Sequence, residues 1–528
     1  MRSSGYSKSQ PEYYKLILDG ISNGVKIDYN GNRNRNRRCV NLPISDEDWP
    51  KVNKVILADV AAGIKVGPFD KPPFEFFSCS PIGCVPKRTK GEIRVIHHLS
   101  HPRGGDNDSI NEHTRDVPIT LGSFDRATDI IKQLGEGCFL IKLDVKAAYK
   151  LVLVCEEDRA LLGFMWEGKY YYERVLPFGL KSSCRIWEWF ATALHFIMNK
   201  SMCIEWIVHY IDDFLIVVKN REEAMKQREK AESLCEKLDV PLAHDKSEGP
   251  VTKLTFLGIE IDTMTMTARL PEEKLSELHT LVGNWGTRTH ANISELKSLE
   301  GVLQWCTKVV RPGRACLERI RQFIKEHSRI SEGPHRLNEE VMRDIGWWFR
   351  FVREWNGVSL LYEVEWQHAT KICLFTDACD DGYGCCLGNH WCHGKFTEEQ
   401  LLRARNKESV SNTRSMPFLE LLALVLAAST WGHMWKGQKI CFVTDCMPVK
   451  DAMTNLRSPS NRLMRLIRHL SSLAARFQFD FKCEWIEGEL NVLADHLSRS
   501  RIQEFLALVP TADPEATPVV PLPPFDEM

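Results

Sequence analysis

The sequence contains no long apolar run. Its richest apolar stretch, LLALVLAA at 421–428, is much shorter than the ~18 residues of a membrane-spanning helix. The first residues, MRSSGYSKSQPEYYKL, have no apolar segment of the kind found in secretory signal peptides. We therefore expect no membrane partner and an intracellular location, in the cytoplasm, the nucleus or both.

Neither sign of charge is in excess. Lysine and arginine number 69 against 70 aspartates and glutamates, so the formal net charge is −1. This balance excludes a uniformly basic nucleic-acid coat protein but leaves room for local basic patches. The 18 cysteines predict reduced thiols in an intracellular chain rather than a disulfide framework.

A chain of 528 residues is too long for one ordinary domain, and its sequence patterns divide it into five segments. These are a polar extension over 1–54, a mixed α/β region over 55–265, a helical region over 266–365, a second α/β region over 370–500 and a proline-rich tail over 501–528. The alternation of strand-like and helix-like stretches indicates α+β and α/β domains. The tail is typical of an extended linker.

Two segments are rich in basic residues. The tract NRNRNRR at 32–38 would contact nucleic acid or act as a nuclear import signal, and a solvated loop is an equally good interpretation. Residues 305–329 hold seven lysines and arginines against two glutamates, on segments with a helical pattern. Such a patch would follow the backbone of a duplex, so binding would weaken steeply with salt.

Acidic residues interrupt apolar strands at two places in the region 55–265. Asp212 and Asp213 lie between the apolar runs of 205–219, and Asp144 ends the run 139–144. Aspartate is disfavoured in strands, and adjacent carboxylates repel each other unless a cation lies between them. An adjacent Asp pair alone is more often a turn. If the two strands are neighbours, Asp144 and Asp212 would share Mg²⁺ ions.

Several motifs around these acids resemble those of reverse transcriptases, in the family's order and spacing. They are VPKRTKGEIRVIHHLS at 85–100, LDVKAAY at 143–149, LPFGLKSSC at 176–184, YIDD at 210–213, AHDKSEGP at 243–250 and FLGIEI at 256–261. The resemblance implies a right-hand polymerase with fingers and a ferredoxin-like palm over 55–265 and a helical thumb and connection over 266–365.

The resemblance also implies roles for the acids and for one hairpin. Asp144 and Asp212 would bind two Mg²⁺ ions, with Mn²⁺ as a substitute, and Asp213 would be a less direct neighbour. Leu257 and Gly258 would form the hairpin that grips the primer. An isolated match to one of these motifs would be weak, but their shared order is specific.

The nucleotide pocket would be formed by five residues of the same motifs. Lys87 and Arg94 would hold the triphosphate, and Gly179 lies in the glycine-containing loop. Tyr149 would be the steric gate that rejects the ribose 2′-hydroxyl, although without the motif a core aromatic would be the better interpretation. Lys246 would protonate the leaving pyrophosphate as a general acid.

A second set of acids lies in the region 370–500. Asp377 and Asp445 follow apolar strands, Glu420 lies in an apolar helix, and Asp495 lies in NVLADHLSR. Together they would form a four-carboxylate site for two Mg²⁺ ions. The motifs TDACDDGYG, FLELLAL, VTDC and GELNVLADHLSR resemble ribonuclease H, which implies cleavage of the RNA strand in RNA–DNA hybrids.

The ribonuclease H resemblance has one departure. Many members carry a mobile histidine shortly before the last aspartate, whereas Glu487-Gly488-Glu489 occupies that stretch here and His496 does not match. Product release or metal exchange would therefore differ. A separate group, Cys385, Cys386, His390, Cys392 and His393, resembles a zinc cluster, but strand alternation would point neighbours to opposite faces. Structural roles are the better interpretation for this group.

Three stretches narrow the resemblance to the polymerase of DIRS-like retrotransposons, which encode a tyrosine recombinase. They are GPFDKPPFEFFSCSPIGCVPK, LLGFMWEGKYYYERVLPFG and VVRPGRACLERI. The stretch ADPEATPVVPLPP resembles the linker before that recombinase, so we expect the recombinase as a partner domain that this chain lacks. The chain would then be a fragment of a longer polyprotein or a decayed copy.

The sequence thus predicts a retrotransposon RNA-directed DNA polymerase with a C-terminal ribonuclease H. Its partners would be an RNA template, a DNA primer, an RNA–DNA hybrid and dNTPs. Three alternatives stay open: a DNA-templated or repair polymerase, an inactive nucleic-acid-binding relic, and a co-opted protein that uses the fold as a scaffold. The first would not require the ribonuclease H acids, and loss of a metal carboxylate would have favoured the second, yet all seven acids are present.

Overall fold

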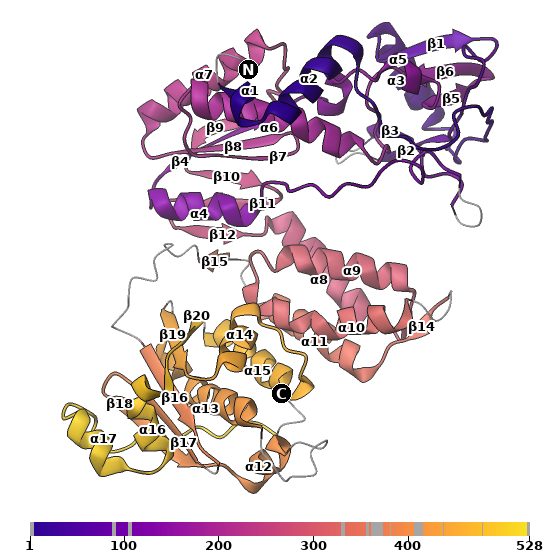
Figure 1. The fold of residues 1–528 in the computed structure, drawn as a ribbon. Coiled ribbons are helices and arrows are strands. Elements are labelled where there is room, and N and C mark those ends of the chain that lie inside the picture. The colour runs from indigo at the N-terminus through magenta and orange to yellow at the C-terminus, as the bar shows by residue number, and fades with distance from the viewer. Residues whose placement is uncertain are drawn as a thin grey trace. The chain divides into compact units, whose positions relative to one another are not determined.

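The computed structural model of the chain describes residues 5–86, 91–103, 108–328, 333–354, 358–360, 373–380, 382–405, 415–436, 438–477 and 479–524. The chain forms two compact units (Figure 1). The first comprises residues 1–257 and 261–266, and the second comprises residues 258–260 and 267–528.

The fingers region of the first unit is built on a three-stranded sheet of order β1-β6-β5 and a separate hairpin of β2 and β3. Its elements are α3 (Trp49–Ala61), β1 (Lys65–Phe69), β2 (Ile82–Pro86), β3 (Ile93–His97), α5 (Glu156–Arg159), β5 (Gly163–Trp166) and β6 (Lys169–Glu173). The N-terminal helices α1 (Tyr6–Ser9) and α2 (Pro11–Asn23) pack instead on α6 (Ser183–Ser201). Val52 and Ile56 of α3 pack with Phe164 and Trp166 of β5 in one apolar cluster.

The basic tract at 32–38 is attached to the fingers by its side chains. Arg33 forms an ion pair of 2.6 Å with Asp158, a carboxylate that is only 1% exposed. Asn36 accepts a hydrogen bond of 2.9 Å from the backbone N–H of Phe77. Arg37 donates to the backbone carbonyl of Asp108 at 3.2 Å. Residues 32–36 and 38 are nevertheless exposed, so the tract is a solvated loop that these three side chains tie to the fingers.

The palm is an antiparallel sheet of order β7-β8-β4-β9. Its elements are α4 (Phe124–Leu134), β4 (Phe139–Asp144), η1 (Ala148–Leu151), α6 (Ser183–Ser201), β7 (Ile207–Tyr210), β8 (Asp213–Val218), α7 (Arg221–Lys237) and β9 (Glu248–Val251). Helices α6 and α7 cover one face of the sheet, where Ile141 and Ile216 pack against them. This strand order, with two crossing helices on one face, confirms the predicted ferredoxin-like palm.

The second unit begins with a helical region. The hairpin before it consists of β10 (Lys253–Phe256), which belongs to the first unit, and β11 (Ile259–Asp262), which spans the division between the units. The elements of the helical region are β12 (Thr267–Arg269), α8 (Glu272–Gly286), β13 (His290–Ala291), α9 (Ile293–Cys306), η2 (Arg311–Cys316), α10 (Glu318–His327), β14 (His335–Arg336), α11 (Glu339–Glu354) and β15 (Val358–Leu360). Helix α8 packs against α11, and α9 packs against α10.

The basic patch predicted at 305–329 is largely neutralised within the second unit. The Arg319 side chain is only 9% exposed. Three of its arginines each pair with a carboxylate: Arg311 with Asp480 at 2.9 Å, Arg319 with Glu340 at 2.6 Å and Arg321 with Glu300 at 2.7 Å. Counting charges within the segment did not reveal these acidic partners, and the expectation that the patch follows the backbone of a duplex stays a prediction.

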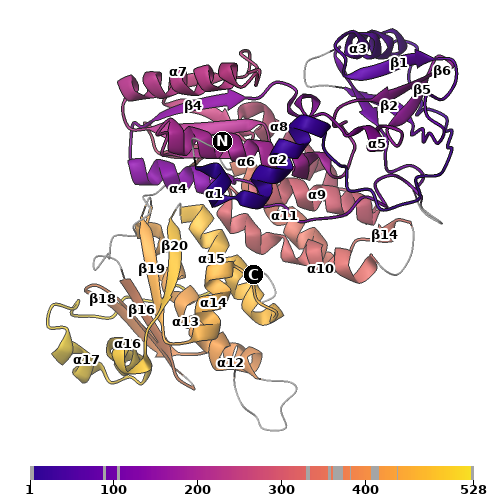
Figure 2. The same cartoon turned by 45° about the horizontal axis from the view of Figure 1, so that its top comes forward.

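The rest of the second unit is an α/β domain on a mixed five-stranded sheet of order β18-β17-β16-β19-β20 (Figure 2). Its elements are β16 (Cys373–Ala378), β17 (Gly382–Leu387), β18 (His390–Lys395), α12 (Glu398–Ala404), α13 (Met416–Trp431), η3 (Gly432–Met434), β19 (Lys439–Thr444), α14 (Met447–Asn455), α15 (Asn461–Phe477), β20 (Asp480–Trp485), η4 (Gly488–Leu490), α16 (Val492–Ser498) and α17 (Ile502–Leu508). Strands β16, β19 and β20 are parallel to one another, β17 pairs antiparallel with β16, and β18 pairs antiparallel with β17.

Helix α13 is the central core helix of this domain. Together with η3 it forms a stretch, Met416–Met434, that is long and apolar enough to cross a membrane by length and composition alone. However, 78% of that stretch is buried inside the fold, as expected of a core helix. Helices α13, α14 and α15 share one apolar cluster, whereas α16 and α17 pack in another with Cys386 and Trp391.

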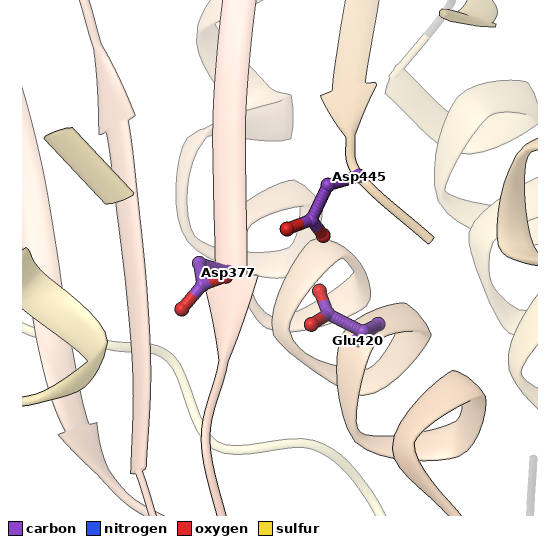
Figure 3. Close-up of side chains that lie close together, drawn as sticks. All are labelled: Asp377, Glu420 and Asp445. Carbon is purple, nitrogen blue, oxygen red and sulfur yellow. The ribbon is translucent and has the colours of Figure 1, made fainter. Parts of the chain in front are cut away.

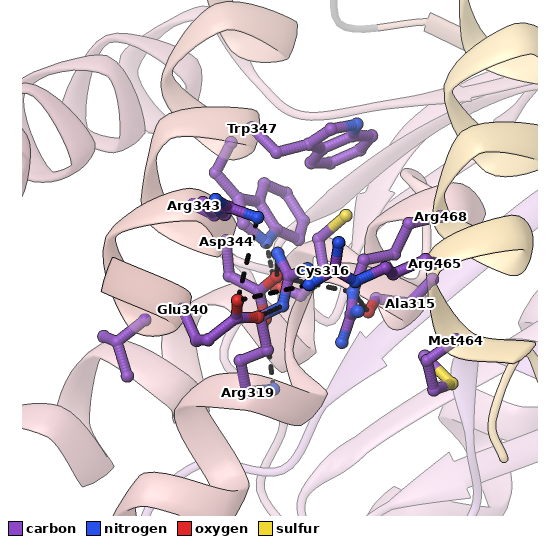
Figure 4. A network of polar contacts seen from close by, with 12 residues as sticks. Ala315, Cys316, Arg319, Glu340, Arg343, Asp344, Trp347, Met464, Arg465 and Arg468 are labelled. Atoms are coloured by element: carbon purple, nitrogen blue, oxygen red, sulfur yellow. Dashed lines mark hydrogen bonds and ion pairs between the residues drawn. The ribbon is translucent and has the colours of Figure 1, made fainter. Parts of the chain in front are cut away.

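A buried polar network joins α15 to the helical region (Figure 4). Asp344 of α11 is 1% exposed and lies 3.4 Å from Arg319 and 3.6 Å from Arg468 of α15. Beside it, Trp347 donates a hydrogen bond of 2.9 Å to the hydroxyl of Ser472. Arg468 points to this network and is 8% exposed.

The proline-rich tail is packed on the domain over its described residues, and the prediction of a free linker is therefore wrong for residues 509–524. The backbone N–H of Thr517 donates to the carbonyl of Trp391 at 2.8 Å, and that of Asp513 donates to Asn389 at 2.9 Å. Val519 and Leu522 pack against the main apolar cluster. The tail therefore lies along the edge strand β18 and covers part of its exposed edge.

Candidate active sites

The three palm carboxylates lie together at one end of the palm sheet. Asp144, the last residue of β4, is directly opposite Asp213, the first residue of β8. Asp212 lies in the turn between β7 and β8, and its carbonyl accepts a hydrogen bond of 2.9 Å from the N–H of Val145. The expectation that the strand 139–144 neighbours the hairpin 205–219 is confirmed.

The turn that carries Asp212 is strained. Ile211 has φ of 57°, a left-handed conformation that is costly for a β-branched residue. The indole N–H of Trp187 in α6 holds it in place by donating to the Ile211 carbonyl at 2.8 Å. Because strain of this kind persists where the surroundings fix it, the turn is a preorganised support for Asp212 and Asp213.

Burial and mutual repulsion disfavour charge on these acids. Burial raises the pKa of Asp144, although Lys246 opposes the shift with its Nζ 3.6 Å from Asp144 Oδ1. Burial also raises the pKa of Asp213 to about 6, against the opposing charge of Lys142. Asp212 adds repulsion to both neighbours. A bound cation would relieve this repulsion, so the cluster suits a metal ion.

The predicted nucleotide-pocket residues gather around Phe178. The ring of Tyr149, in the short helix η1, lies 5.1 Å from the Phe178 ring, centroid to centroid. The guanidinium of Arg94 lies over the Phe178 ring, 5.1 Å from its centroid, in a cation–π contact. Gly179 has φ of 106°, and a Cβ there would lie 2.1 Å from the carbonyl oxygen of His97. Only glycine fits this position. Lys87 lies outside the described residues.

Tyr149 is half-buried and neutral. Burial raises the pKa of its hydroxyl, and a hydrogen bond with Cys184 adds to the shift. Phe178 is a site residue that sequence reasoning did not assign, although it stands in the quoted motif LPFGLKSSC. The available signal was its place directly before Gly179. The contact with the His97 carbonyl fixes the backbone of that glycine, so the neighbouring aromatic ring is held in one place.

Leu257 and Gly258 form the turn between β10 and β11, where the two units divide. Their φ values are 49° and 80°, so both central residues are left-handed, as in the tight turns that favour hairpins. A Cβ on Gly258 would lie 3.1 Å from the ring of Trp305. The predicted hairpin is therefore present, and its role in gripping a primer stays a prediction.

The second acidic site lies in the α/β domain of the second unit. Asp377 of β16, Glu420 of α13 and Asp445 after β19 place carboxylate oxygens within 4.8 Å of one another (Figure 3). Asp495 of α16 contributes repulsion to Asp377 and Asp445 and is held by Arg499, whose Nε donates to it at 2.6 Å. The structure thus brings three of the predicted acids into one cluster with the fourth beside it.

The acids of this site are buried enough to resist ionisation. Burial raises the pKa of Asp377 to about 6, partly offset by the hydroxyl of Ser498, which donates a hydrogen bond to it. Burial raises the pKa of Glu420 well above its ordinary value, and its Oε2 has no hydrogen-bond partner among the described residues. Asp445 is also raised in pKa by burial. A buried carboxylate oxygen without a partner suits a hard cation such as Mg²⁺.

The stretch Glu487-Gly488-Glu489, where a histidine was expected from the family pattern, lies against this cluster. Gly488 begins η4, and a Cβ there would lie 3.1 Å from Asp445 Oδ2. His496 is in α16 beside Asp495, and its Nδ1 is buried without a hydrogen-bond partner. The loop backbone, rather than an imidazole, is what this chain brings next to Asp445.

The cysteine and histidine group of β17 and β18 is split between two faces of the sheet. Cys385 and Cys392 are directly opposite each other and lie in the main apolar cluster. Cys386 packs on the other face with Trp391. His390 forms an ion pair with Asp513 of the tail. The alternation expected from the sequence is confirmed, and these thiols are free core residues.

Two family models match this chain. Residues 85–261 match reverse transcriptase (RNA-dependent DNA polymerase), and residues 367–473 match the RNase H-like domain found in reverse transcriptase. The first match contains the palm carboxylates and nucleotide-pocket residues, and the second contains Asp377, Glu420 and Asp445.

Curated relatives include the Transposon Tf2-3 and Tf2-7 polyproteins of Schizosaccharomyces pombe. Each is 22% identical over 474 residues, which is 87% of this chain and 31% of the relative. The chain thus spans about a third of the length of the curated relatives it matches. Neither of these two relatives is named as a DIRS-like element.

Solved structures with similar folds include the foamy viral protease-reverse transcriptase. Its complex with dsDNA has a TM-score of 0.48 and 15% identity, covering 90% of this chain and 94% of that one. A form named dRH with ds DNA has a TM-score of 0.49 and 14% identity, covering 87% and 73%. From the two family matches, the chain contains a reverse transcriptase domain followed by an RNase H-like domain.

Proposed function

We propose that this chain is a retrotransposon RNA-directed DNA polymerase whose C-terminal domain degrades the RNA of RNA–DNA hybrids. The observation that carries the proposal is the pair of carboxylate clusters, one within each family match. Asp144 and Asp213 face each other in the palm, and Asp377, Glu420 and Asp445 converge within 4.8 Å in the second unit. The proposed partners are an RNA template, a DNA primer, their hybrid and dNTPs.

Mg²⁺ is the proposed cofactor at both clusters, with Mn²⁺ as a substitute. The clusters offer carboxylate oxygens, the ligands that Mg²⁺ prefers, and within the part of the chain that the structure describes Glu420 Oε2 has no hydrogen-bond partner. Asp144 and Asp212 would hold the ions in the palm, and Asp377, Glu420, Asp445 and Asp495 would hold them in the second unit. Two ions would lower the pKa of the attacking hydroxyl or water and stabilise charge on the leaving oxygen.

In the palm, the primer 3′-oxygen attacks the α-phosphorus of the dNTP and the bond to pyrophosphate breaks. Arg94 binds the triphosphate, together with Lys87, and Tyr149 excludes a 2′-hydroxyl. Lys246 donates a proton to the leaving pyrophosphate, a role supported by its position 3.6 Å from Asp144 and its 60% exposure to solvent. Leu257 and Gly258 hold the primer end.

In the second unit, a water molecule displaces the ribose oxygen from the scissile phosphorus of the RNA strand. Asp377 is oriented for this by the Ser498 hydroxyl, and Glu420 by the backbone N–H of Ala378 at 3.3 Å. Arg499 holds Asp495 beside the cluster. Because the acids repel one another, metal binding and substrate binding would occur together at this site.

We also propose that the element is DIRS-like and that a tyrosine recombinase is encoded downstream. The three DIRS-like stretches and the tail over 512–524 support this proposal. A recombinase reading frame next to this one in the same element would agree with it, and an integrase frame would contradict it. The proposed location is the cytoplasm or nucleus, which a fluorescent fusion would test.

Primer extension on a labelled RNA template tests the function in one tube. With Mg²⁺ and dNTPs, we expect the DNA primer to lengthen and the template to be cut behind it. A matched reaction with a labelled DNA template should show extension without template cleavage. A folded, monodisperse protein that gives neither product on the RNA template would contradict the proposed function.

A further inference from the structure

A cluster of oppositely charged side chains lies inside the fingers. Lys65 Nζ lies 2.8 Å from Asp59 Oδ2 and 3.1 Å from Glu173 Oε1, and the Lys65 side chain is only 6% exposed. Asp59 and Glu173 are buried as well. Lys65 of β1 is directly opposite Glu173 of β6, which places their side chains on the same face of the sheet.

Lys150 extends this cluster to η1. Its Nζ lies 2.5 Å from the second carboxylate oxygen of Asp59, and its side chain is 28% exposed. The four residues Asp59, Lys65, Lys150 and Glu173 therefore carry two positive and two negative charges and balance each other. Charges this deeply buried need their partners, because water cannot replace them. Asp59 is the member that joins the two lysines.

The helix η1 is the turn that carries Tyr149. It spans only Ala148–Leu151, so Tyr149 and Lys150 are neighbours within a single 3₁₀ turn. The preceding Ala147 has φ of 53°, a left-handed conformation that only tertiary contacts maintain in a residue other than glycine. Since so short a turn has few hydrogen bonds of its own, the ion pair between Lys150 and Asp59 is the contact that anchors it to α3.

The same cluster touches the residues that face Tyr149. His97 lies beside it, with Nδ1 3.8 Å from Glu173 Oε1. The backbone N–H of His97 donates to the Phe178 carbonyl at 3.4 Å. The carbonyl oxygen of His97 lies so near Gly179 that no Cβ would fit there. Phe178 is the ring that Tyr149 contacts. Lys150, anchored on Asp59, is thus the chain neighbour of Tyr149, while Phe178 is held by the backbone N–H of His97, whose imidazole Nε2 bonds to the Gly163 carbonyl at 3.1 Å.

We propose that Asp59 and Lys150 are positioning residues that fix the Tyr149 ring and thereby set how strongly the polymerase rejects ribonucleotides. The inference rests on the proposed polymerase function and adds a specificity determinant outside the nucleotide pocket. Both residues act through Tyr149 rather than on the nucleotide. A small displacement of the ring changes the room left for a 2′-hydroxyl, so selection is more sensitive to this anchor than synthesis itself.

The variant Lys150→Met tests the anchor, because it removes the charge and keeps most of the aliphatic stem. Asp59 retains Lys65 as a partner in this variant, so the fold should survive. We expect the ratio of kcat/KM for dNTPs to that for rNTPs to fall at least tenfold. Lys150→Arg restores a cation and should return the ratio to within threefold of the original protein.

The matched control is Lys169→Met, the same change in an exposed lysine of the fingers that pairs with Asp70. It should leave the ratio unchanged. Asp59→Asn provides a second measurement and should lower the ratio in the same direction as Lys150→Met. Cleavage of a preformed hybrid in each preparation reports that the second unit is folded.

An unchanged dNTP/rNTP ratio in Lys150→Met, with normal extension, would overturn the inference. So would slower extension with the ratio preserved, because that result would give Lys150 a purely structural role. The proposed function fails separately: its failure would appear as an unaltered protein that does not extend primers at all, and the inference would fall with it.

Discussion

Asp144 and Asp213 lie directly opposite each other on β4 and β8, beside the strained turn that carries Asp212. Two strands far apart in the sequence thus present three acids at one edge of the palm. Burial raises the pKa of both Asp144 and Asp213, so the sheet holds acids whose charges favour a cation. The buried, mutually repelling acids at this edge therefore suit a bound cation.

We expect Asp212→Asn to reduce DNA synthesis at least a thousandfold while hybrid cleavage stays within about twofold. The reason is that Asp212 and the acids Asp377, Glu420 and Asp445 belong to different units. Primer extension and cleavage of a preformed labelled hybrid measure the two activities. Asp445→Asn is the reciprocal variant and should spare extension. Loss of both activities in a folded single variant would contradict a model of two separate sites.

Tyr149→Ala should admit ribonucleotides. Removing the ring opens the space beside Phe178, where the 2′-hydroxyl of an incoming nucleotide would otherwise collide. We expect rNTP incorporation to rise at least tenfold relative to dNTP incorporation, measured in single-nucleotide extension. Tyr149→Phe is the control, because it keeps the ring and loses only the hydroxyl that bonds with Cys184. Sugar selection that is equal in all three proteins would show that the gate assignment is wrong.

The sequence was most informative where a motif determines both the residue type and the backbone conformation. The acids that interrupt strand patterns predicted that strand 139–144 lies beside the hairpin 205–219, and the resemblance to reverse transcriptases implied the ferredoxin-like palm; the structure has both. Gly179 is similar, because its contact with the His97 carbonyl leaves no room for another residue. The family pattern named these positions in the sequence, and the structure supplies the distant contact that makes glycine necessary at Gly179.

The contacts that sequence reasoning missed all involve distant partners. Residues 305–329 looked like a free basic surface, yet Arg319 pairs with Glu340 and Asp344. The tail looked like a linker, yet Thr517 bonds to the edge strand β18. Charge counts and proline content describe a segment by itself, whereas these contacts depend on tertiary packing. The anchor of Lys150 on Asp59 was missed for the same reason.

Asp344→Asn should destabilise the second unit strongly. The change leaves the buried guanidinium groups of Arg319 and Arg468 without their shared carboxylate, which typically costs about 3–5 kcal/mol. We expect a lower thermal midpoint for unfolding, followed by circular dichroism. Glu339→Gln is the control, since Glu339 is 78% exposed in its pair with Arg343 and should change stability by less than about 0.5 kcal/mol. Equal midpoints for the two variants would contradict a stabilising role for the buried network.

The acids around Asp377 should make the metal-free protein less stable at neutral pH than in mild acid. Because the pKa of Asp377 is about 6 in the folded chain and about 4 in an unfolded one, folding takes up protons between these values. Stability therefore falls as pH rises from about 4 to about 6 and then levels off. Glu420 shifts in the same direction and adds to the effect.

Asp377→Asn removes this penalty, and at pH 7.5 without metal it should raise the free energy of unfolding by about 1–2 kcal/mol. Mg²⁺ should stabilise the unaltered protein at that pH, since it binds the ionised acids of the folded state, and should stabilise the variant much less. Asp451→Asn, at a 60% exposed position, is the control and should behave like the unaltered protein. Thermal unfolding with and without Mg²⁺ at pH 5 and pH 7.5 measures each of these differences. A variant that is less stable than the unaltered protein without metal would show that Asp377 serves the fold rather than the cation.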